Sequence, residues 1–466
     1  MEHMAEAVEL IDRERERALL LEAIEHPPSL VVLIGRRRVG KSFLLSSVLS
    51  GPRVVGFHAD EQREEHQLDL LGREVSRLLP GRPLVFLPDW SDAFGLLERE
   101  AVERGPLALV LDEFQYLCAA QPALPSMIQR TWDRWQRAGV PITLVLSGSA
   151  LSFMEGLLTY RAPLYGRATQ RPFLRPLDYR DAAGFVRSRS PEALLRRYAV
   201  LGGTPQYQAW AGDRSLEAVV RDAILTKGAP LYEDPLHLLR EGEGIRDPGT
   251  YVSILRAIAG GATQYNEIAT RARIPTGNLS VRLARLEELG YVEPWRPLSS
   301  GGRNRRVSYR IADPYFRFFF RYVFPNRSRL ERGRAAEVAD EVLADLDNLM
   351  GRSFEDACRT WVGRYADEDA VGRSEELGSW WSRDGQVEID VVGVAKGRCT
   401  FLGSCKWARR VGVQVLDELR DAQAALGGKA TTAQLAVFGR SSFDPALRRR
   451  AADEGVMLVT AADLFR

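Results

Sequence analysis

Four short apolar runs in the first third of the chain lack alternation with polar residues. They cover residues 30–34, 53–57, 107–111 and 142–146. Strands of this kind are buried on both faces, which is typical of a parallel sheet sandwiched between helices. The pattern therefore predicts an α/β domain over residues 1–176.

The pattern changes further along the chain. Residues 177–246 read as helical, broken at Gly202-Gly203-Thr204-Pro205, and we interpret them as a helical lid. Residues 247–334 show three helical stretches and then two strands around a Ser/Gly-rich turn, the order of a winged helix-turn-helix. Residues 335–466 alternate helices and strands, which predicts a further α/β domain.

The composition is that of a globular protein from a reducing compartment. Apolar residues make up 45% of the 466 positions, and 64 Lys and Arg against 62 Asp and Glu leave a net charge of +2. The four cysteines form no CxxC pair, which argues against a disulfide framework or a zinc site. No apolar run approaches the roughly 18 residues of a membrane helix, and the acidic start differs from a signal peptide. We expect a cytoplasmic location and no membrane partner.

A phosphate-binding motif follows the first apolar run. Residues 35–42 read GRRRVGKS, which matches GxxxxGK[ST] between a strand and a helix that begins at Lys41. The glycines let backbone N–H groups wrap phosphates, the ammonium of Lys41 reaches the β- and γ-phosphates, and the hydroxyl of Ser42 binds Mg²⁺. The motif predicts ATP and Mg²⁺ as ligands, bound by Gly35, Arg36, Arg37, Arg38, Val39, Gly40, Lys41, Ser42 and Phe43.

Two carboxylates end the third apolar run. Asp112 is placed to hold Mg²⁺ and Glu113 to polarise the attacking water, the two acidic roles that nucleotide hydrolysis requires. The fourth run ends in Ser147-Gly148-Ser149, where a hydroxyl either senses the γ-phosphate or only ends a strand. We therefore predict Lys41, Asp112 and Glu113 as catalytic residues.

With these motifs the chain resembles the prokaryotic AAA/STAND-related P-loop ATPases that end in a DUF234 domain. The resemblance implies that Arg13 and Glu14 lie near the adenine, that Pro205 packs on it, and that Arg167 is a phosphate-facing catalytic residue, in cis or in trans. The segments that carry it are IDRE (11–14), GRRRVGKS (35–42), LDEFQYL (111–117), SGS (147–149), PLYGR (163–167), GGTP (202–205), IADPYFRF (311–318) and GRSFE (351–355).

Arginines gather around the predicted wing. Residues 300–334 contain ten arginines and two acids, a local net charge of +8, which is the pattern of a phosphate-binding surface. We predict double-stranded DNA as a partner; the alternative is a winged helix that only packs within the protein. The predicted DNA contacts, from the third helix and the wing tip, are Asn278, Ser280, Arg282, Arg285, Arg303, Arg305 and Arg306.

The last domain resembles restriction-endonuclease-like folds over residues 350–440. Asp390 on one strand and Lys406 on the next match a pattern in which carboxylates bind Mg²⁺ and the lysine orients hydroxide. Ser404, a weaker neutral ligand, stands where the second acid is expected. Glu388, on the same strand face as Asp390, and Glu355 are the further candidate ligands. We interpret the site as degenerate, with an ATP-gated, Mg²⁺-dependent DNA nuclease as the alternative.

Together these features predict an α/β multidomain protein. It would comprise a P-loop NTPase parallel sheet with a helical lid, a winged helix-turn-helix and a C-terminal α/β restriction-endonuclease-like domain. The predicted function is an ATP-binding and hydrolysing switch coupled to a DNA-binding winged helix and a degenerate nuclease-like domain. A signalling or scaffold ATPase whose winged helix binds protein is the other alternative, and a homo-oligomer is compatible with the motifs.

Overall fold

The computed structural model describes residues 10–79, 84–242, 245–298, 307–382 and 385–466. The chain divides into two compact units, one up to Pro176 and one from Leu177 onward. Within the described ranges no helix combines the length and the apolarity needed to cross a membrane. All four cysteines are free and buried, as expected for a chain without a disulfide framework.

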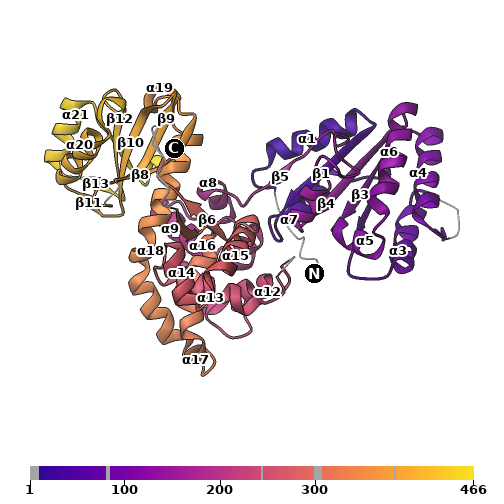
Figure 1. Ribbon diagram of the computed structural model, residues 1–466, viewed down its shortest axis with the longest axis horizontal. Helices are drawn as coiled ribbons and strands as arrows, with labels where there is room; N and C mark the ends of the chain where they lie inside the picture. The colour runs from indigo at the N-terminus through magenta and orange to yellow at the C-terminus, as the bar shows by residue number, and fades with distance from the viewer. Residues whose placement is uncertain (1–9, 80–83, 243–244, 299–306, 383–384) are drawn as a thin grey trace. The chain divides into compact units, whose positions relative to one another are not determined.

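The first unit is built on a five-stranded parallel sheet with the strand order β2-β3-β4-β1-β5 (Figure 1). The four predicted runs form its first four strands, whereas β5 is too short to produce an apolar signal. The strands are β1 Ser29–Gly35, β2 Val54–His58, β3 Leu107–Asp112, β4 Ile142–Gly148 and β5 Phe173–Leu174. The helices are α1 Glu14–Glu25, α2 Lys41–Val48, α3 Glu64–Ser76, α4 Trp90–Arg104, α5 Phe114–Ala120, α6 Leu124–Ala138 and α7 Leu151–Gly156.

Apolar side chains cover both faces of this sheet. One face packs against α3 to α6 around Trp90, Trp132 and Trp135, and the other packs against α1 and α2 around Leu20 and Leu44 (Figure 1). This two-sided burial is the reason that β1, β3 and β4 are uniformly apolar. The prediction of burial on both faces is wrong for β2, which lies at the edge of the sheet and has one exposed face with Gly56 and His58. The loops after β1, β3 and β4 leave from the carboxyl edge of the sheet, which is where ligands bind in open α/β sheets.

The second unit begins with short helices that share one apolar core with the winged helix that follows. A Cβ on Gly203 would lie 1.7 Å from the carbonyl oxygen of Leu177, so only glycine fits there. The glycines of the GGTP segment therefore have a packing role inside this unit. The elements are α8 Tyr179–Ala182, η1 Ala183–Phe185, α9 Pro191–Leu201, α10 Pro205–Ala211, α11 Leu216–Ala218, η2 Val219–Ile224 and α12 Asp234–Arg240.

The winged helix has the predicted order of three helices and an antiparallel hairpin. Its first and second helices form a close pair, and the third, α15, buries Leu279, Leu283 and Leu286. The predicted wing tip with Arg303, Arg305 and Arg306 lies outside the described residues. The elements are α13 Pro248–Ala259, α14 Tyr265–Ala272, α15 Thr276–Glu288, β6 Val292–Trp295 and β7 Ser308–Ile311.

A 30-residue helix, α18 Ala335–Arg364, connects the winged helix to the C-terminal sheet and contributes to the apolar core of both (Figure 1, orange). It is preceded by short helical segments rich in aromatic residues, and the rings of Tyr315, Phe316 and Phe319 among them are buried. These preceding elements are α16 Pro314–Phe318, η3 Phe319–Val323, η4 Phe324–Asn326 and α17 Arg327–Leu330.

The C-terminal sheet has the strand order β14-β12-β10-β9-β8, antiparallel from β8 to β10 and parallel from β10 to β14. This mixed sheet completes the predicted α/β multidomain fold class, which is confirmed. Its elements are α19 Glu368–Val371, β8 Glu376–Trp381, β9 Glu388–Ala395, β10 Arg398–Lys406, β11 Arg410–Val411, α20 Gln414–Leu426, η5 Gly427–Lys429, β12 Gln434–Gly439, β13 Ser442–Phe443, α21 Pro445–Glu454, β14 Met457–Thr460 and η6 Asp463–Phe465.

Candidate nucleotide-binding site

The loop between β1 and α2 has the conformation that a phosphate-binding loop requires. Gly40 has φ 92°, a left-handed value that glycine adopts without strain, and Lys41 then opens α2. The ammonium of Lys41 donates to the carbonyl oxygens of Gly35, at 2.9 Å, and Arg36, at 3.1 Å. Burial lowers the pKa of Lys41 against the opposing effect of Glu113 and Asp112. The lysine is thus held inside the loop at a helix N-terminus, where phosphate oxygens are favoured.

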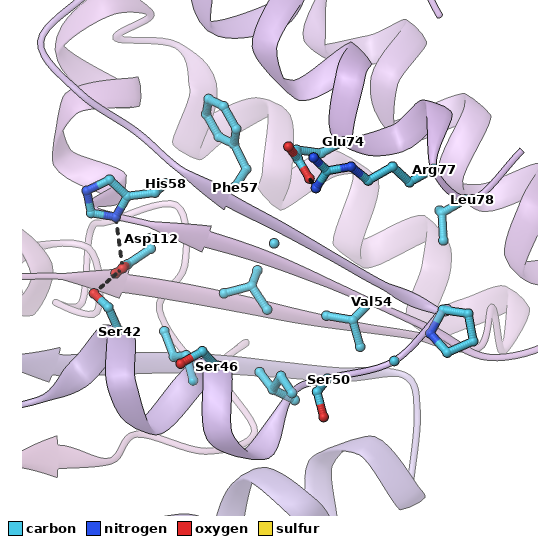
Figure 2. A pocket seen from close by; sticks show the side chains of 16 residues that line it. Ser42, Ser46, Ser50, Val54, Phe57, His58, Glu74, Arg77, Leu78 and Asp112 are labelled. Atoms are coloured by element: carbon cyan, nitrogen blue, oxygen red, sulfur yellow. Dashed lines mark hydrogen bonds and ion pairs between the residues drawn. The ribbon is translucent and has the colours of Figure 1, made fainter. Parts of the chain in front are cut away.

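The two predicted Mg²⁺ ligands of the nucleotide site are in direct contact. The hydroxyl of Ser42 donates to Oδ2 of Asp112 at 2.5 Å, and Nδ1 of His58 lies 3.1 Å from the same oxygen (Figure 2). Burial alone would raise the pKa of Asp112, but hydrogen bonds from Ser42 and His58 hold it below its ordinary value. An ionised carboxylate beside a hydroxyl is a hard oxygen donor set, which suits Mg²⁺.

His58 is a site residue that the sequence reasoning missed. It ends β2, and the parallel register of β2 with β3 places it opposite Asp112. Its side chain remains 64% exposed. The sequence signal is its position directly after the second apolar run, but the strand order that places it beside Asp112 is seen only in the structure.

Glu113 is held by the two neighbouring motifs. Its Oε2 accepts hydrogen bonds from the Ser149 hydroxyl at 2.7 Å, from the Ser149 backbone N–H at 3.2 Å, and from the side-chain amide of Gln115. Glu113 itself has φ 54°, an unusual conformation for a residue with a side chain. Of the two serines considered as γ-phosphate sensors, Ser149 is therefore the one bonded to the candidate general base. Gln115, part of the LDEFQYL segment, was not predicted as a site residue.

Other predicted nucleotide contacts are distributed around the loop. Arg13 is buried, and its Nη2 donates to the carbonyl of Arg175 at 2.6 Å and to that of Val39, in the loop itself, at 3.4 Å. Nη2 of Arg37 donates to the hydroxyl of Tyr116 at 2.5 Å. These contacts fix the loop to the segments before and after it. Two further predicted residues, Glu14 at the start of α1 and Phe43 in α2, are exposed.

Arg167 makes a two-point ion pair inside the first unit. Its Nε and Nη2 donate to the two carboxylate oxygens of Asp133 at 2.7 and 2.9 Å, and Nη1 donates to the carbonyls of Pro163 and Tyr165. An arginine that contacts phosphate from this position must first exchange Asp133 for the phosphate. Pro205 is the first residue of α10 in the second unit.

A groove of about 570 Å³ extends from the Ser42 and Asp112 pair along the edge of the sheet (Figure 2). It runs between α2 and the exposed face of β2, with Glu74 of α3 and Arg77, the residue that follows α3, at its border. His58 and Asp112 lie at one end of the groove and Ser50 and Val54 lie toward the other (Figure 2). The groove therefore borders the predicted metal-ligand pair, of which Ser42 is exposed and Asp112 is buried.

The predicted DNA-reading residues of α15 differ in accessibility. Asn278 and Ser280 are exposed. Arg282 donates back to the carbonyl of Asn278 at 2.9 Å, and Arg285 pairs with Glu288 at 2.7 Å. Asn278 and Ser280 are therefore the most accessible of the four predicted contacts.

Six of the ten arginines that the sequence concentrates between residues 300 and 334 form ion pairs with acids from outside this window. Four of the partners lie on α18, outside the sequence window: Glu337, Glu341, Asp345 and Asp356. The window charge therefore overstates the cationic surface. The pairs are Arg310 with Glu293, Arg317 with Asp356, Arg321 with Asp345, Arg327 with Glu233, Arg329 with Glu341, and Arg334 with Glu337.

The C-terminal candidate site brings its carboxylates into electrostatic range. Burial, together with repulsion from Asp390, raises the pKa of Glu355 to about 7, and burial raises those of Glu388 and Asp390. Oδ2 of Asp390 already accepts the backbone N–H of Cys405 at 2.6 Å. Lys406 lies at the end of β10 and forms a 3.9 Å ion pair with Glu418. Among the residues that the structure describes, no three His, Cys, Asp or Glu side chains group as metal ligands.

Comparisons with known proteins agree with a DUF234 assignment for part of the chain. Residues 319–418 match the family DUF234, described as archaea bacterial proteins of unknown function. The uncharacterized protein MJECL04 of Methanocaldococcus jannaschii is 26% identical over 401 residues, which is 85% of this chain and 87% of that protein.

Solved structures also resemble parts of the chain. The Walker-type ATPase PABY2304 of Pyrococcus abyssi is 24% identical, with 67% of this chain and 96% of that one covered and a TM-score of 0.48. The ORC2 protein of Aeropyrum pernix, solved in ADPNP-ADP complexes, is 17% identical, with 74% and 98% covered and a TM-score of 0.45.

Proposed function

We propose that this chain, which carries a DUF234 domain behind a P-loop domain, is a Mg²⁺-dependent ATPase that acts as a switch for its second unit. The hydrogen bond between Ser42 and Asp112 carries the proposal. It joins the phosphate-binding loop to the acidic end of β3, so the groups that hold nucleotide and metal occupy one site. Both donors are oxygens suited to Mg²⁺, which when bound neutralises charge on the phosphates.

Each residue of the site has its own role in ATP hydrolysis. Lys41 and the backbone N–H groups at the start of α2 bind the phosphates. Glu113 accepts a proton from the attacking water, and the bonds from Ser149 and Gln115 to its Oε2 orient the carboxylate. Arg13 supports the loop through the carbonyl of Val39. Arg167 serves as a phosphate-facing residue only after release from Asp133, and we keep it as a candidate, in cis or in trans.

We further propose that nucleotide state controls binding of double-stranded DNA by the winged helix. The exposed residues Asn278 and Ser280 and the arginines of the wing support this role. Four free, buried cysteines suit the reducing, cytoplasmic setting in which such a switch would work. The switch works only if the bound nucleotide favours one conformation of the chain over the other, because a ligand with equal affinity for both conformations shifts nothing.

The C-terminal domain, in this proposal, is nuclease-like but does not cut. Ser404 offers a neutral oxygen where an acid is needed, and Asp390 is engaged by the N–H of Cys405. Its remaining role is to bind DNA or a partner.

The test of the proposal is ATP turnover by the full chain with Lys41→Ala, beside Lys227→Ala as the matched control. Lys227 is exposed in the second unit, so its loss removes the same charge without touching the loop. We expect turnover to fall about a hundredfold or more with Lys41→Ala, because a preorganised charge facing the phosphates is lost. The control should retain wild-type turnover. Equal turnover in the two variants would refute the assignment.

A further inference from the structure

Two sequence motifs that the nucleotide site does not use meet inside the second unit. The IADPYFRF segment contributes Arg317 from α16, and the GRSFE segment contributes Arg352 from α18. Arg310 of β7 and Arg359, two turns after Arg352, complete a cluster of four guanidinium groups, which we call the arginine cluster. At its centre lies Asp356.

The acids that face the arginine cluster do not balance it. Asp356 pairs with Arg359 at 2.8 Å, Arg310 at 3.5 Å and Arg317 at 3.7 Å. Glu293 pairs with Arg310 but is 40% exposed. Glu355 lies 3.9 Å from Arg359, close to the outer limit of an ion pair. Asp356 is thus the one carboxylate that several of the four arginines share in these printed pairs, beside the half-exposed Glu293 and the more distant Glu355, and incompletely compensated buried charge is costly.

The cluster also contains buried donors without acceptors. Nε and Nη2 of Arg352 and Nε of Arg317 are buried and, among the described residues, have no hydrogen-bond partner. Arg317 is only 8% exposed. Burial, followed by the charges of Arg310 and Arg317, lowers the pKa of Arg352 to about 9. Orphaned charged N–H groups of this kind are rare in folded proteins and indicate a missing acceptor.

The geometry of the orphaned atoms fits an acceptor with two oxygens. Nε and Nη2 form the same edge of a guanidinium group, and their N–H bonds are parallel, which matches two oxygens of a carboxylate or phosphate. The flat faces of two other arginines are already occupied by Trp295, which lies 3.1 Å from Arg310 and 4.7 Å from Arg359, measured from Cζ to the ring centroid. Excess positive charge favours a dianion over a carboxylate.

We propose that the arginine cluster is a binding site for one phosphate group, with Arg352 as its two-point ligand and Arg317 as a second donor. Arg352 as a residue is partly exposed, so the cluster lies directly under the surface. The phosphate comes either from free inorganic phosphate or from the end of a nucleic acid strand. In either case it joins the winged helix, through Arg310 and Arg317, to α18.

The test uses the full chain with Lys41→Ala, so that the phosphate-binding loop cannot bind the probe. Calorimetric titration with inorganic phosphate at constant ionic strength should show one site per chain. Adding Arg352→Met should weaken this site about tenfold or more, since a charge-assisted two-point contact is lost. The matched control, Arg332→Met, removes an exposed arginine of the same unit and should leave the affinity unchanged. No binding in the Lys41→Ala chain, or equal binding with Arg352→Met, would overturn the proposal.

A second variant covers the case in which Arg352→Met does not fold. Arg352→Lys keeps the charge but lacks the parallel N–H pair, and it should also bind phosphate more weakly. Phosphate should raise the melting temperature of the Lys41→Ala chain above that in chloride of equal ionic strength, and no rise would contradict the site. A 5′-phosphorylated dinucleotide that competes with phosphate, while its unphosphorylated form does not, identifies the strand end as the source; no competition identifies free phosphate.

Discussion

Ser42 and Asp112 are separated by 70 positions in the chain, yet the hydroxyl of one donates to the carboxylate of the other at 2.5 Å. Ser42 is the second residue of α2 and Asp112 the last residue of β3. The parallel sheet produces this contact because β1 and β3 both end at its carboxyl edge. Substitutions in this one pair therefore test whether the phosphate-binding loop and the acidic strand end act as one site.

The Ser42→Ala variant should need about tenfold more Mg²⁺ for half-maximal ATP turnover, the equivalent of about 1.4 kcal/mol for one lost oxygen ligand. Turnover at saturating Mg²⁺ should change less. The measurement is ATP hydrolysis across a Mg²⁺ titration. Ser47→Ala is the matched control, because the Ser47 hydroxyl on the same helix only donates to the carbonyl of Phe43 at 2.7 Å. An identical Mg²⁺ requirement in both variants would argue against Ser42 as a ligand.

The Glu113→Gln variant should bind ATP with unchanged affinity and hydrolyse it about 10² to 10³ times more slowly, since a positioned general base is removed. The amide keeps the shape of the side chain and still accepts from Ser149, so the loop should not rearrange. Single-turnover hydrolysis and calorimetric ATP binding measure the two quantities separately. Loss of binding and hydrolysis together would instead indicate a structural role for Glu113.

The stability of the protein should depend on Glu355 in a defined pH window. Its folded pKa is about 7, above the ordinary value of 4.5, so the folded state holds a proton that the unfolded state releases. The contribution of Glu355 to stability is therefore greatest below about pH 4.5, falls as pH rises toward 7, and is constant beyond it. The Glu355→Gln variant should lack this fall and be more stable than wild type at pH 8 by up to about 3 kcal/mol.

Urea unfolding of wild type and Glu355→Gln at pH 5 and pH 8 checks the predicted pH dependence of the free energy of unfolding. The two proteins should differ little at pH 5, where Glu355 is protonated in the folded state. Glu375→Gln is the matched control, because Glu375 belongs to the same unit and bonds the backbone N–H of Lys396 outside the carboxylate cluster. A constant difference at both pH values would exclude the titration of Glu355 as the cause.

Supercoiled plasmid should remain intact with the full chain in Mg²⁺ or Mn²⁺, with or without ATP. The reason is the incomplete ligand set: Ser404 is neutral, and Asp390 accepts the N–H of Cys405 at 2.6 Å. Gel electrophoresis of the plasmid, beside the Asp390→Ala variant, is the measurement. Nicking that disappears in Asp390→Ala would establish an active nuclease, and dependence of that nicking on Lys41 would show that ATP gates it.

The parts of the fold that the sequence predicts well are those determined by local patterns. The strands β1, β3 and β4 are buried on both faces and therefore uniformly apolar, and the loop from Gly35 to Ser42 is contiguous in the chain. His58 could not be found in this way, because its contact with Asp112 depends on the register between two strands. Arg317 and Arg352 were noticed only as parts of motifs, since their meeting depends on how α16 packs on α18.

The charge of the winged helix shows even more clearly that local patterns do not predict contacts between separate elements. The window from 300 to 334 contains Asp313 and Glu331 as its only acids, and its net charge is +8. The folded chain supplies Glu233, Glu337, Glu341 and Asp345 from outside this window as partners for Arg327, Arg334, Arg329 and Arg321. A count along the sequence cannot detect such pairing, because the acids come from other helices.

The difference between the charge of the sequence window and the ion pairs of the folded chain leads to a prediction about DNA binding. Replacing Arg303, Arg305 and Arg306 together by alanine should weaken binding of a DNA duplex and reduce the slope of log K against log[salt] by about 2 to 3, because each phosphate contact contributes about 0.9. The matched control is the triple variant Arg321→Ala, Arg329→Ala, Arg334→Ala, which removes the same charge from arginines paired with acids of α18. Its slope should stay close to that of wild type.

Gel-shift titrations between 50 and 200 mM salt, about the range over which phosphate contacts are resolved, measure both slopes. Equal reductions in the two variants would mean that the whole arginine-rich stretch contacts DNA, and no DNA binding in wild type would favour a winged helix that serves as a protein-interaction module.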